Sequence, residues 1–582
     1  MIPRCDSAWS YSGTLRSTSE ERLQLANRWF QQCTSTHTCR PSNTGFTPRR
    51  LIYIGDTNQR LRLIETAIGF LDTDLQYVAL SYCWGPGGGT LTTTLDNIEA
   101  HKRQIPFNHL PSTIRDAVFL CRNLSINYLW VDALCIIQDP GNADWLEESG
   151  RMNLIYSNAA LTIAADESPT CTAGFWHPEN TRFQKVSESC WIRDTPPCAR
   201  DIISTRGWTL QERILSHRIL HFSNASISWE CDACCRFEDG ETKIDFTGLS
   251  YRTFRLLNRS APHESLGKSI LGDGFEDARE GDYDPVHITD FLTSGSWKSI
   301  FFAWAAIIEN YSKRDLTQPG DKLPAISGLA SFVLTQAGLG DESYLAGLWR
   351  EDLVEGLLWY VSTVRPSRSS APYIAPTWSW ASMTGSIHYF RDRYQFPFKS
   401  HISISDAHCT TSPTDPTGRV TGGIIHLAGL MVEVDLAVIP YPPSFRSSYK
   451  DAGGTPIRAQ DQQVAFIRPR QKAGNDETRW YEVMYDEKAE LNGTEDHFYG
   501  RGAKPSVNKS LDDISDRGAY FCLSVGALVD SVTGGQRDWF LVLQKTLGNE
   551  VYKRVGIGYF QYSRRTEFSL FSNSDIYHIA LI

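Results

Sequence analysis

The stretch "INYLWVDALCIIQ", residues 126–138, decides the fold class of this chain. It is almost continuously apolar, and such a short apolar run is typical of a strand covered on both faces of a sheet. Two further apolar runs, "YVALSY" (77–82) and "LTIAAD" (161–166), lie before and after it along the chain. We therefore expect three strands of one sheet.

The segments between these runs have the spacing of helices. In "LPSTIRDAVFLCRNL" (110–124) and "DWLEESGRMNLIYSNAAL" (144–161), apolar residues recur every three or four positions. A strand–helix–strand–helix–strand order places the strands parallel, with right-handed crossovers. The sequence thus predicts an α/β domain with a parallel sheet.

The length of 582 residues predicts about two to four domains. We divide the chain into an N-terminal lead-in (1–76), the α/β domain (77–235), a mainly helical region (236–400) and a β-rich C-terminal domain (401–582). The last assignment follows from several β-like runs separated by turn residues. Within the helical region, "TQPGDKLPAISGLASFV" (317–333) is interpreted as a turn.

The composition argues against several classes of protein. A net charge of −10 disfavours a broad nucleic-acid-binding surface. The first residues lack the apolar segment of a secretory signal, and no run reaches the roughly 18 apolar residues of a membrane span. The 14 cysteines are therefore expected to be reduced, in the cytoplasm or nucleus.

A cysteine and histidine group in the lead-in raises the question of a metal. "WFQQCTSTHTCRP" contains Cys33, His37 and Cys39, and "CDACC" (231–235) is a source for the fourth ligand that zinc requires. The spacings match no familiar zinc module, so reduced, packed thiols are the favoured interpretation. We assign no metal from the sequence.

A carboxylate lies on the inward face of the second predicted helix. Trp145, Glu148, Met152, Ile155 and Ala159 follow one another at intervals of three and four residues, which makes one helical stripe. Four of these residues are apolar or small, so the acid is expected to face the sheet. An unpaired charge in such a place costs several kcal/mol.

Two explanations for Glu148 are open. One is an internal ion pair, with Arg115 or Arg206 as the cation. The other is a carboxylate kept in an apolar pocket for acid–base chemistry or for binding ribose.

Asp132 and Cys135 raise the same question within the central apolar run. Asp132 interrupts a sequence that otherwise avoids charge, and Cys135 follows near the carboxyl end of the predicted strand. A thiolate nucleophile needs a positive neighbour or a base, which His217 or His221 would have to supply in space. A buried, inert thiol is the favoured alternative.

Ligands of open parallel sheets bind at the carboxyl ends of the strands. The glycine loop after "YVALSY" is expected at this rim, where backbone N–H groups of residues 85–89 would face a phosphate. The cluster "RGWTLQER" (206–213) adds a cation and an acid. The expected catalytic residues are Glu148, Asp132 and Cys135. The expected ligand-binding residues are Ser81, Trp84, Gly85, Gly87, Gln138, Asp139, Trp145, Arg206 and Glu212.

These motifs together resemble a known family. "YVALSYCWG", "LWVDALCIIQD" and "RGWTLQERILSHRILHF", in this order over 77–231, are similar to the fungal heterokaryon-incompatibility (HET) domain. "DKLPAISGLA", "YLAGLW" and "APTWSWAS" resemble the region that follows this domain in large fungal members, which extends the resemblance to about residue 382.

The resemblance implies a cytoplasmic fungal protein that acts in non-self recognition (allorecognition) and programmed cell death, a form of innate immunity. It also implies a remote relation to Toll/interleukin-1 receptor (TIR) domains, which have a flavodoxin-like fold. Some TIR domains cleave NAD with a helix glutamate that follows a tryptophan. Glu148 matches that place, although it lies three residues after Trp145 and the usual interval is four.

The resemblance leaves two modes of action. In one, the protein is an NAD glycohydrolase whose only small-molecule requirement is NAD itself, as substrate. In the other, it is a self-associating signalling module or scaffold without catalysis. Its expected partners are further copies of itself, through the HET domain, and a protein involved in non-self recognition.

Overall fold

The computed structural model describes the chain in separate stretches. They are residues 19–37, 39, 45–55, 60–66, 75–86, 91–141, 143–176, 183–187, 190–193, 202–223, 226–238, 297–361, 373–390, 397–412, 415–440, 463–470, 481–486, 516–529, 536–546, 550–562, 571 and 574–582. Two compact units are present. The first comprises Met1–Ala278, Arg314–Leu316 and Ala325–Phe332, and the second comprises Arg279–Lys313, Thr317–Pro324 and Val333–Ile582.

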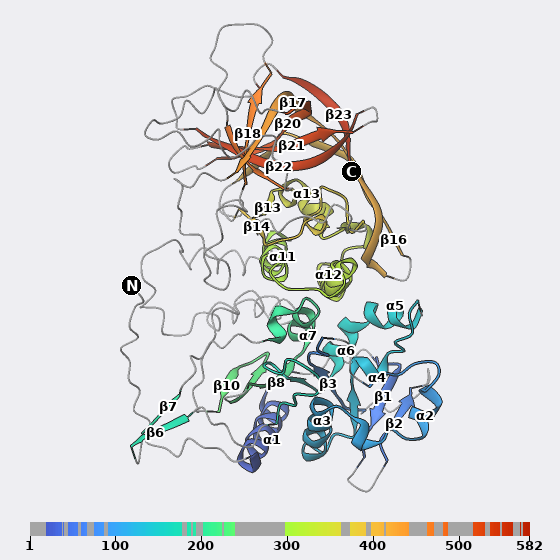
Figure 1. Ribbon diagram of the computed structural model, residues 1–582. Helices are drawn as coiled ribbons and strands as arrows, with labels where there is room; N and C mark the ends of the chain where they lie inside the picture. The colour runs from blue at the N-terminus through green and yellow to red at the C-terminus, as the bar shows by residue number, and fades with distance from the viewer. Residues whose placement is uncertain are drawn as a thin grey trace. The chain divides into compact units, whose positions relative to one another are not determined.

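The first unit is built on an eight-stranded sheet (Figure 1) with the strand order β10-β9-β8-β5-β3-β4-β1-β2. The central strands β4, β3, β5 and β8 are parallel, and the outer strands are antiparallel. The strands are β1 (Arg50–Tyr53), β2 (Arg62–Glu65), β3 (Tyr77–Ser81), β4 (Tyr128–Trp130), β5 (Leu161–Ala164), β8 (Arg218–Phe222), β9 (Ile227–Cys231) and β10 (Cys235–Phe237).

The predicted α/β class and the parallel pairing of the three predicted strands are confirmed. The sheet as a whole is mixed, however, and not parallel as expected. Both edges of the sheet contain antiparallel strands, because short connections join β1 to β2 and β8 to β9 and β10 as hairpins. Strands β1 and β2 lie before residue 77, in the stretch expected to be a lead-in.

Helices cover both faces of this sheet. Figure 1 shows α1 and α3 on one side and α6 and α7 on the other. Strands β3, β5 and β8 are consequently buried along their whole length. The helices are α1 (Ser19–Thr36), α2 (Ile98–Arg103), α3 (Ser112–Asn123), α4 (Asp132–Cys135), α5 (Ala143–Gly150), α6 (Met152–Asn158) and α7 (Thr209–Leu215), with 3-10 turns η1 (Phe107–His109) and η2 (Ile203–Thr205) and a separate hairpin β6 (Phe183–Ser187) and β7 (Cys190–Arg193).

The strand predicted over 126–138 is shorter than expected. It ends at Trp130, and the helical turn α4 follows. The turn closes because the Cys135 N–H donates to the Val131 carbonyl at 2.7 Å, while Asp132 Oδ1 accepts the N–H of Ala133 at 2.7 Å. Apolar composition cannot separate a buried turn from a buried strand.

The second predicted helix is two helices. Helix α5 ends at Gly150, and α6 begins at Met152, because Arg151 has a backbone conformation (φ −102°, ψ 2°) outside the helix. Glycine has a low helix propensity, which agrees with the break at this point. The burial of the stripe is confirmed at Glu148, which is 1% exposed. Trp145 is only half-buried.

The second unit begins with helices and short hairpins. Its elements before residue 390 are α11 (Trp297–Tyr311), η5 (Pro319–Asp321), α12 (Pro324–Ala337, partly assigned to the first unit), η6 (Asp341–Ser343), β11 (Tyr344–Leu345), β12 (Leu348–Trp349), η7 (Arg350–Asp352), α13 (Leu353–Gly356), β13 (Trp359–Val361), η8 (Trp380–Ser382) and β14 (Ile387–Tyr389). The turn expected over 317–333 is wrong, because α12 begins there. Pro324 suits its first turn, and Gly338 ends it with a φ of +64°.

The predicted β-rich C-terminal region is confirmed as a nine-stranded sheet, in which a pairing of β17 with β20 closes the path β20-β21-β22-β19-β18-β17 into a ring. The strands are β15 (Phe398–Ser400), β16 (Ser403–Ser412), β17 (Asp415–Pro440), β18 (Gln463–Pro469), β19 (Tyr481–Tyr485), β20 (Asp516–Val529), β21 (Gln536–Lys545), β22 (Val551–Tyr562) and β23 (Asp575–Leu581).

Arg554 of this sheet forms a buried ion pair and also binds the segment before β13. Arg554 Nε lies 2.8 Å from Asp486 Oδ2, and Arg554 Nη1 donates to the Leu357 carbonyl at 2.6 Å. Both charged side chains are almost completely buried. Among the helices in the described stretches, none combines the length and the apolar character required to cross a membrane.

Candidate functional site at the carboxyl edge of the parallel strands

The carboxyl ends of β3, β4, β5 and β8 lie at one edge of the sheet, because these strands are parallel. Strand β3 comes first of the four along the chain, but it lies between β4 and β5. The order of the parallel strands therefore reverses at β3. Such a switch point is where open α/β sheets place their ligands.

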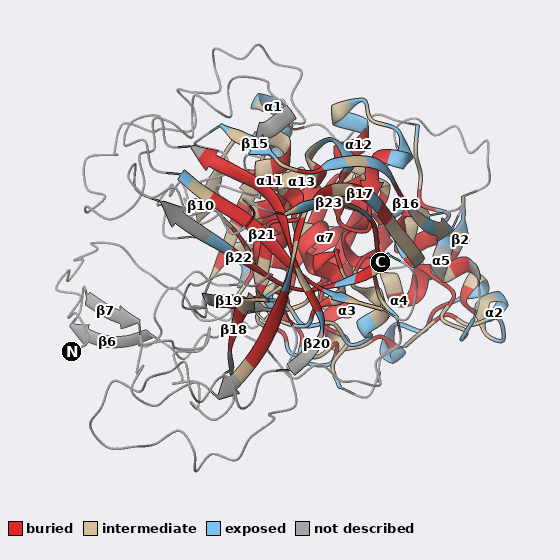
Figure 2. Ribbon diagram, turned by 90° about the horizontal axis from the view of Figure 1, so that it is seen from above, coloured by how far each residue is buried: buried red, intermediate tan, exposed pale blue. Residues whose placement is uncertain are grey.

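Glu212 and Ser81 meet at this edge. Ser81 is the last residue of β3, and its Oγ donates to Glu212 Oε2 at 2.5 Å. Glu212 lies on α7, a helix that is buried almost throughout (Figure 2) because Leu210, Ile214 and Leu215 pack inward. Burial raises the pKa of Glu212 to about 7, and the Ser81 hydroxyl opposes that rise.

Asp132 is the second acid at the edge. Trp84 Nε1 donates to its Oδ2 at 2.9 Å. Burial raises the pKa of Asp132, while the Ala133 N–H, the Trp84 indole and the positive charge of Arg206 lower it. Arg206 itself donates to the Tyr82 carbonyl at 2.6 Å.

Five predicted residues are thus brought together around the end of β3. We call Ser81, Trp84, Asp132, Arg206 and Glu212 the polar cluster. It contains one buried acid (Glu212), one half-buried acid (Asp132) and one cation, so removal of a proton from either acid changes the balance of charge in the cluster. Groups in this situation are frequent in functional sites.

A crevice opens beside the polar cluster, with about 320 Å³ of empty space that includes its open mouth. As it stands, it admits only about one or two water molecules. Its lining includes Ser81 from β3, Ala164 from β5 and His221 from β8, so it follows the carboxyl edge of the sheet. The other lining residues are Thr162, Asp166, Ile203, Ser204, Thr209, Arg213, Ile219 and Arg314.

His221 carries a positive charge in this crevice. Its Nδ1 is 3.0 Å from Asp166 Oδ2, and its Nε2 is 3.1 Å from Glu230 Oε2. Burial alone would lower the pKa of His221, but the charge of Asp166 and the hydrogen bonds to Asp166 and Glu230 raise it to about 9. With Arg213 and Arg314, the crevice has three cationic side chains.

The glycine loop is described only at its start. Gly85 has a φ of +93°, and a Cβ placed there would lie 2.7 Å from Thr170 Cγ2. Its role is therefore a turn packed closely against a neighbouring segment. Gly87, predicted to bind a ligand, lies outside the described residues.

Glu148 has surroundings different from those of the polar cluster. It is 1% exposed, and its Oε1 lies 3.4 Å from Arg151 Nη1. Burial raises its pKa, and the charge of Arg50 lowers it. The predicted ion-pair partners, Arg115 and Arg206, donate instead to Ser112 Oγ and to the Tyr82 carbonyl. Their expected pairing with Glu148 is wrong, because the partner is Arg151, which lies between α5 and α6. Glu148 is absent from the lining of the crevice described above, as are Glu212 and Asp132; Ser81 is the member of the polar cluster that lines it.

Cys135 lies at the end of α4 and is completely buried. Burial raises the pKa of its thiol to about 12, so the thiolate form is disfavoured. Its sulfur contacts the Val131 N–H and the Leu129 carbonyl. The contacts of His217 and His221 are with carboxylates: Asp232 for the first, and Asp166 and Glu230 for the second.

Three remaining predicted residues have local contacts. Gln138 Nε2 donates to the Asp132 carbonyl at 3.1 Å, and Asp139 Oδ2 accepts the Leu95 N–H at 2.7 Å. The ring of Trp145 packs edge-on against Trp208, with 5.9 Å between centroids. Gln138 and Asp139 follow a helical turn and not the predicted strand end, which is a second consequence of the shorter β4.

Sequence reasoning missed most of the crevice. Asp166 is the last residue of the predicted strand 161–166, and His221 lies near the end of "RILHF", so strand-end polarity was the available signal. Arg314 had no comparable signal, because it comes from a segment about a hundred residues further along the chain. Its Nη1 donates to the Arg206 carbonyl at 3.1 Å.

Comparison with known proteins identifies the same part of the chain. Residues 77–212 match the family model described as heterokaryon incompatibility protein (HET). The match begins at the first residue of β3 and ends at Glu212, so it includes the whole polar cluster. No curated protein and no solved structure matches the chain. Residues 77–212 of the chain are therefore a heterokaryon incompatibility (HET) domain.

Proposed function

We propose that this protein acts in fungal non-self recognition as a cytoplasmic effector of programmed cell death, and that the crevice beside the polar cluster is its active site. The proposal is supported by the HET family match. The observation that carries it is the Ser81–Glu212 pair, a buried acid with a pKa of about 7 at the switch point of a parallel sheet.

The reaction we propose is hydrolysis of NAD. The N-glycosidic bond between nicotinamide and ribose breaks, and its electron pair leaves with nicotinamide. Water then adds to the ribose carbon and releases a proton, which gives ADP-ribose. The reaction is chosen because of the remote relation to TIR domains that the sequence resemblance implies, and the reversal of strand order at β3 supports a ligand site at this edge.

The charges of the crevice suit this substrate. Arg213, Arg314 and protonated His221 are cations that would attract the pyrophosphate oxygens of NAD once the ion pairs of Arg213 and His221 with Glu230 and Asp166 open. An ionised Glu212 or Asp132 would stabilise the positive charge that develops on the ribose ring. Because the crevice now has room for little more than water, substrate entry requires the side chains at its mouth to move.

The test is nicotinamide release by the purified full chain at high protein concentration. We expect Glu212→Gln to reduce the rate at least tenfold, because it removes the charge and keeps the hydrogen bond with Ser81. Glu148→Gln tests the residue indicated by the TIR resemblance. Glu147→Gln is the matched control, because Glu147 is exposed on the same helix.

Retained nicotinamide release in Glu212→Gln would contradict our assignment of the site. If Glu148→Gln alone abolished release, the TIR-like glutamate would be the catalytic residue. No release by folded wild-type protein, together with undiminished killing of fungal cells by Glu212→Gln, would reject catalysis.

The second candidate function is a self-associating signalling module. It is favoured by the tight crevice and by the pairing of Glu148 with Arg151. Leu95 and Phe119 are apolar side chains exposed on the first unit, at 59% and 44%. In this case Leu95→Asp or Phe119→Asp would abolish cell death and oligomers seen by light scattering, whereas Glu212→Gln would leave both intact.

A further inference from the structure

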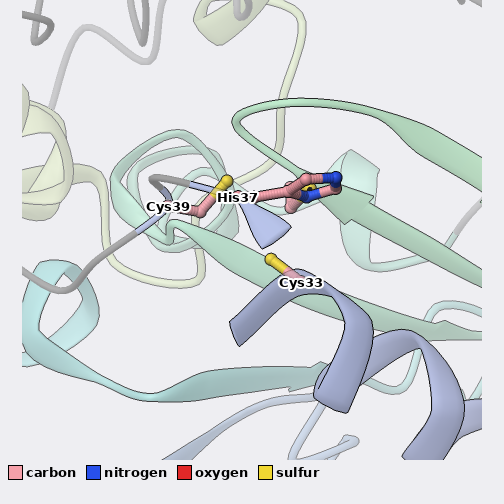
Figure 3. A group of neighbouring side chains, drawn as sticks. Cys33, His37 and Cys39 are labelled. Atoms are coloured by element: carbon pink, nitrogen blue, oxygen red, sulfur yellow. Dashed lines mark hydrogen bonds between the residues drawn. The ribbon is translucent and has the colours of Figure 1, made fainter. Parts of the chain in front are cut away.

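A group of metal-ligand side chains lies away from the polar cluster, between α1 and the hairpin β9–β10. Cys33 is in the last turn of α1, and the His37 N–H donates to its carbonyl at 3.1 Å, so both side chains lie on one helical face. Figure 3 shows Cys33 at the end of α1, with His37 and Cys39 in the segment that follows. Cys231 ends β9 and supplies a fourth ligand atom.

The distances are close to those of a tetrahedral metal site. The Sγ atoms of Cys33, Cys39 and Cys231 and one nitrogen of His37 all lie within 4.8 Å of one another. His37 Nδ1 is 3.5 Å from Cys231 Sγ. Zinc held by sulfur at about 2.3 Å and nitrogen at about 2.0 Å keeps its ligand atoms about 3.5 to 3.8 Å apart. Small side-chain movements would therefore complete the tetrahedron.

The ligand chemistry selects zinc among common metals. Three thiols and one imidazole are soft or borderline ligands, which disfavour magnesium and calcium and suit zinc. The three cysteines are buried, so a metal bound there is shielded from water. Four protein ligands leave no open position, which is the arrangement of a structural site and not of a catalytic one.

Arg218 supplies the outer contacts that such a site needs. It is 5% exposed, its Nε lies 3.3 Å from Cys33 Sγ, and it also donates to the carbonyl of Cys39. Zinc with three thiolates and one neutral histidine carries a net charge of about −1. The guanidinium would balance this charge and orient one of the sulfur ligands.

We propose that Cys33, His37, Cys39 and Cys231 bind one structural Zn²⁺ ion. The ion joins the end of α1 to the edge of the sheet, and its ligands are separated by as many as 198 residues, from Cys33 to Cys231. Zinc binding therefore fastens helix α1 onto strand β9 by a long-range cross-link. This inference does not depend on the proposed NAD chemistry.

The first test is the zinc content of the full chain, purified with a phosphine reductant in buffer without chelator. We expect about one zinc ion per chain by plasma mass spectrometry. Cys231→Ser and His37→Ala should lose most of it, whereas His37→Cys should retain it, because four thiolates also bind zinc. Cys234→Ser is the matched control, since its sulfur is 3.8 Å from that of Cys231 but it is not among the four ligands.

A second measurement uses wild-type protein, so it does not depend on whether the variants fold. Chelator-stripped wild-type protein titrated with Co²⁺ should develop the intense visible and near-ultraviolet absorption of a tetrahedral thiolate site, and zinc should remove it. Chelation should also accelerate hydrogen exchange in α1 while leaving the second unit unchanged.

Folded wild-type protein without stoichiometric zinc and without cobalt absorption would overturn the proposal. So would a disulfide among these cysteines in freshly purified reduced protein, or loss of zinc in Cys234→Ser with retention in His37→Ala. Each of these results would show that Cys33, His37, Cys39 and Cys231 do not together form a zinc site.

Discussion

The Glu212→Gln variant should become more stable than the wild type as the pH rises. In the folded protein, burial raises the pKa of Glu212 from its ordinary value of 4.5 to about 7. The unfolded chain therefore loses this proton first, and wild-type stability falls as the pH rises from about 4.5 to about 7 and is then constant. The difference in pKa corresponds to about 3 kcal/mol, of which about 2 kcal/mol develops between pH 5.5 and pH 8.

The measurement is urea unfolding of the full chain, read by pulsed hydrogen exchange in peptides from β3 and α7, so that the first unit is followed separately. Glutamine keeps an oxygen that accepts a hydrogen bond from the Ser81 hydroxyl, and it cannot ionise. The substitution therefore removes only the pH-dependent part of the free energy of unfolding. Glu147→Gln is the control, because it makes the same replacement at a side chain that is 44% exposed. A Glu212→Gln difference that stays constant from pH 5.5 to pH 8, or that makes the variant less stable at pH 8, would refute a raised pKa.

Three other changes test separate parts of the structure. Arg554→Met should destabilise the second unit by about 3–5 kcal/mol, because it leaves Asp486 buried and unpaired, and adding Asp486→Asn should recover most of the loss in chemical unfolding. Gly85→Ala should lower stability by about 1–3 kcal/mol, because φ is +93° at this position and the new methyl group would collide with Thr170. Thermal unfolding measures this loss, and an unchanged midpoint temperature would contradict the prediction. His221→Gln should be less stable than the wild type by about 3 kcal/mol below pH 6.5, because the pKa of His221 is raised from 6.5 to about 9 in the folded protein. The difference in stability should disappear as the pH rises through about 9. An equal difference at pH 6 and pH 9.5 would show that His221 carries no such charge.

Local sequence patterns predicted the parallel strands and part of the site well. The apolar runs before Ser81 and around Leu161 are buried, and such runs indicate strands covered on both faces. Parallel strands bring their carboxyl ends to one edge, so Ser81 and Asp132 could be expected near each other without knowledge of any contact, whereas Glu212 reaches this edge from helix α7.

Other parts could not be predicted, because they depend on contacts distant in sequence. Strands β1 and β2 are four residues each and pair at the sheet edge, where no local pattern marks them as partners of β4. Likewise, Arg314 lines the crevice, but the sequence around it indicates only the end of a helix. A residue's own neighbours do not show which distant charge will be placed beside it.

Glu148 and Glu212 show the limit of periodicity as a guide to chemistry. The helical stripe correctly predicted that Glu148 is buried, yet burial has two outcomes for an acid: a partner close to it in sequence, or a polar site shared with other elements. Glu148 has Arg151 three residues away, and Glu212 has Ser81 from a different strand. The contacts of each acid therefore separate the two cases better than the depth of burial does, although the charge of Arg50 on β1 also acts on Glu148. A buried acid with a cation three or four positions away is more simply explained by local pairing, and one whose partner comes from a strand end is the stronger candidate for function.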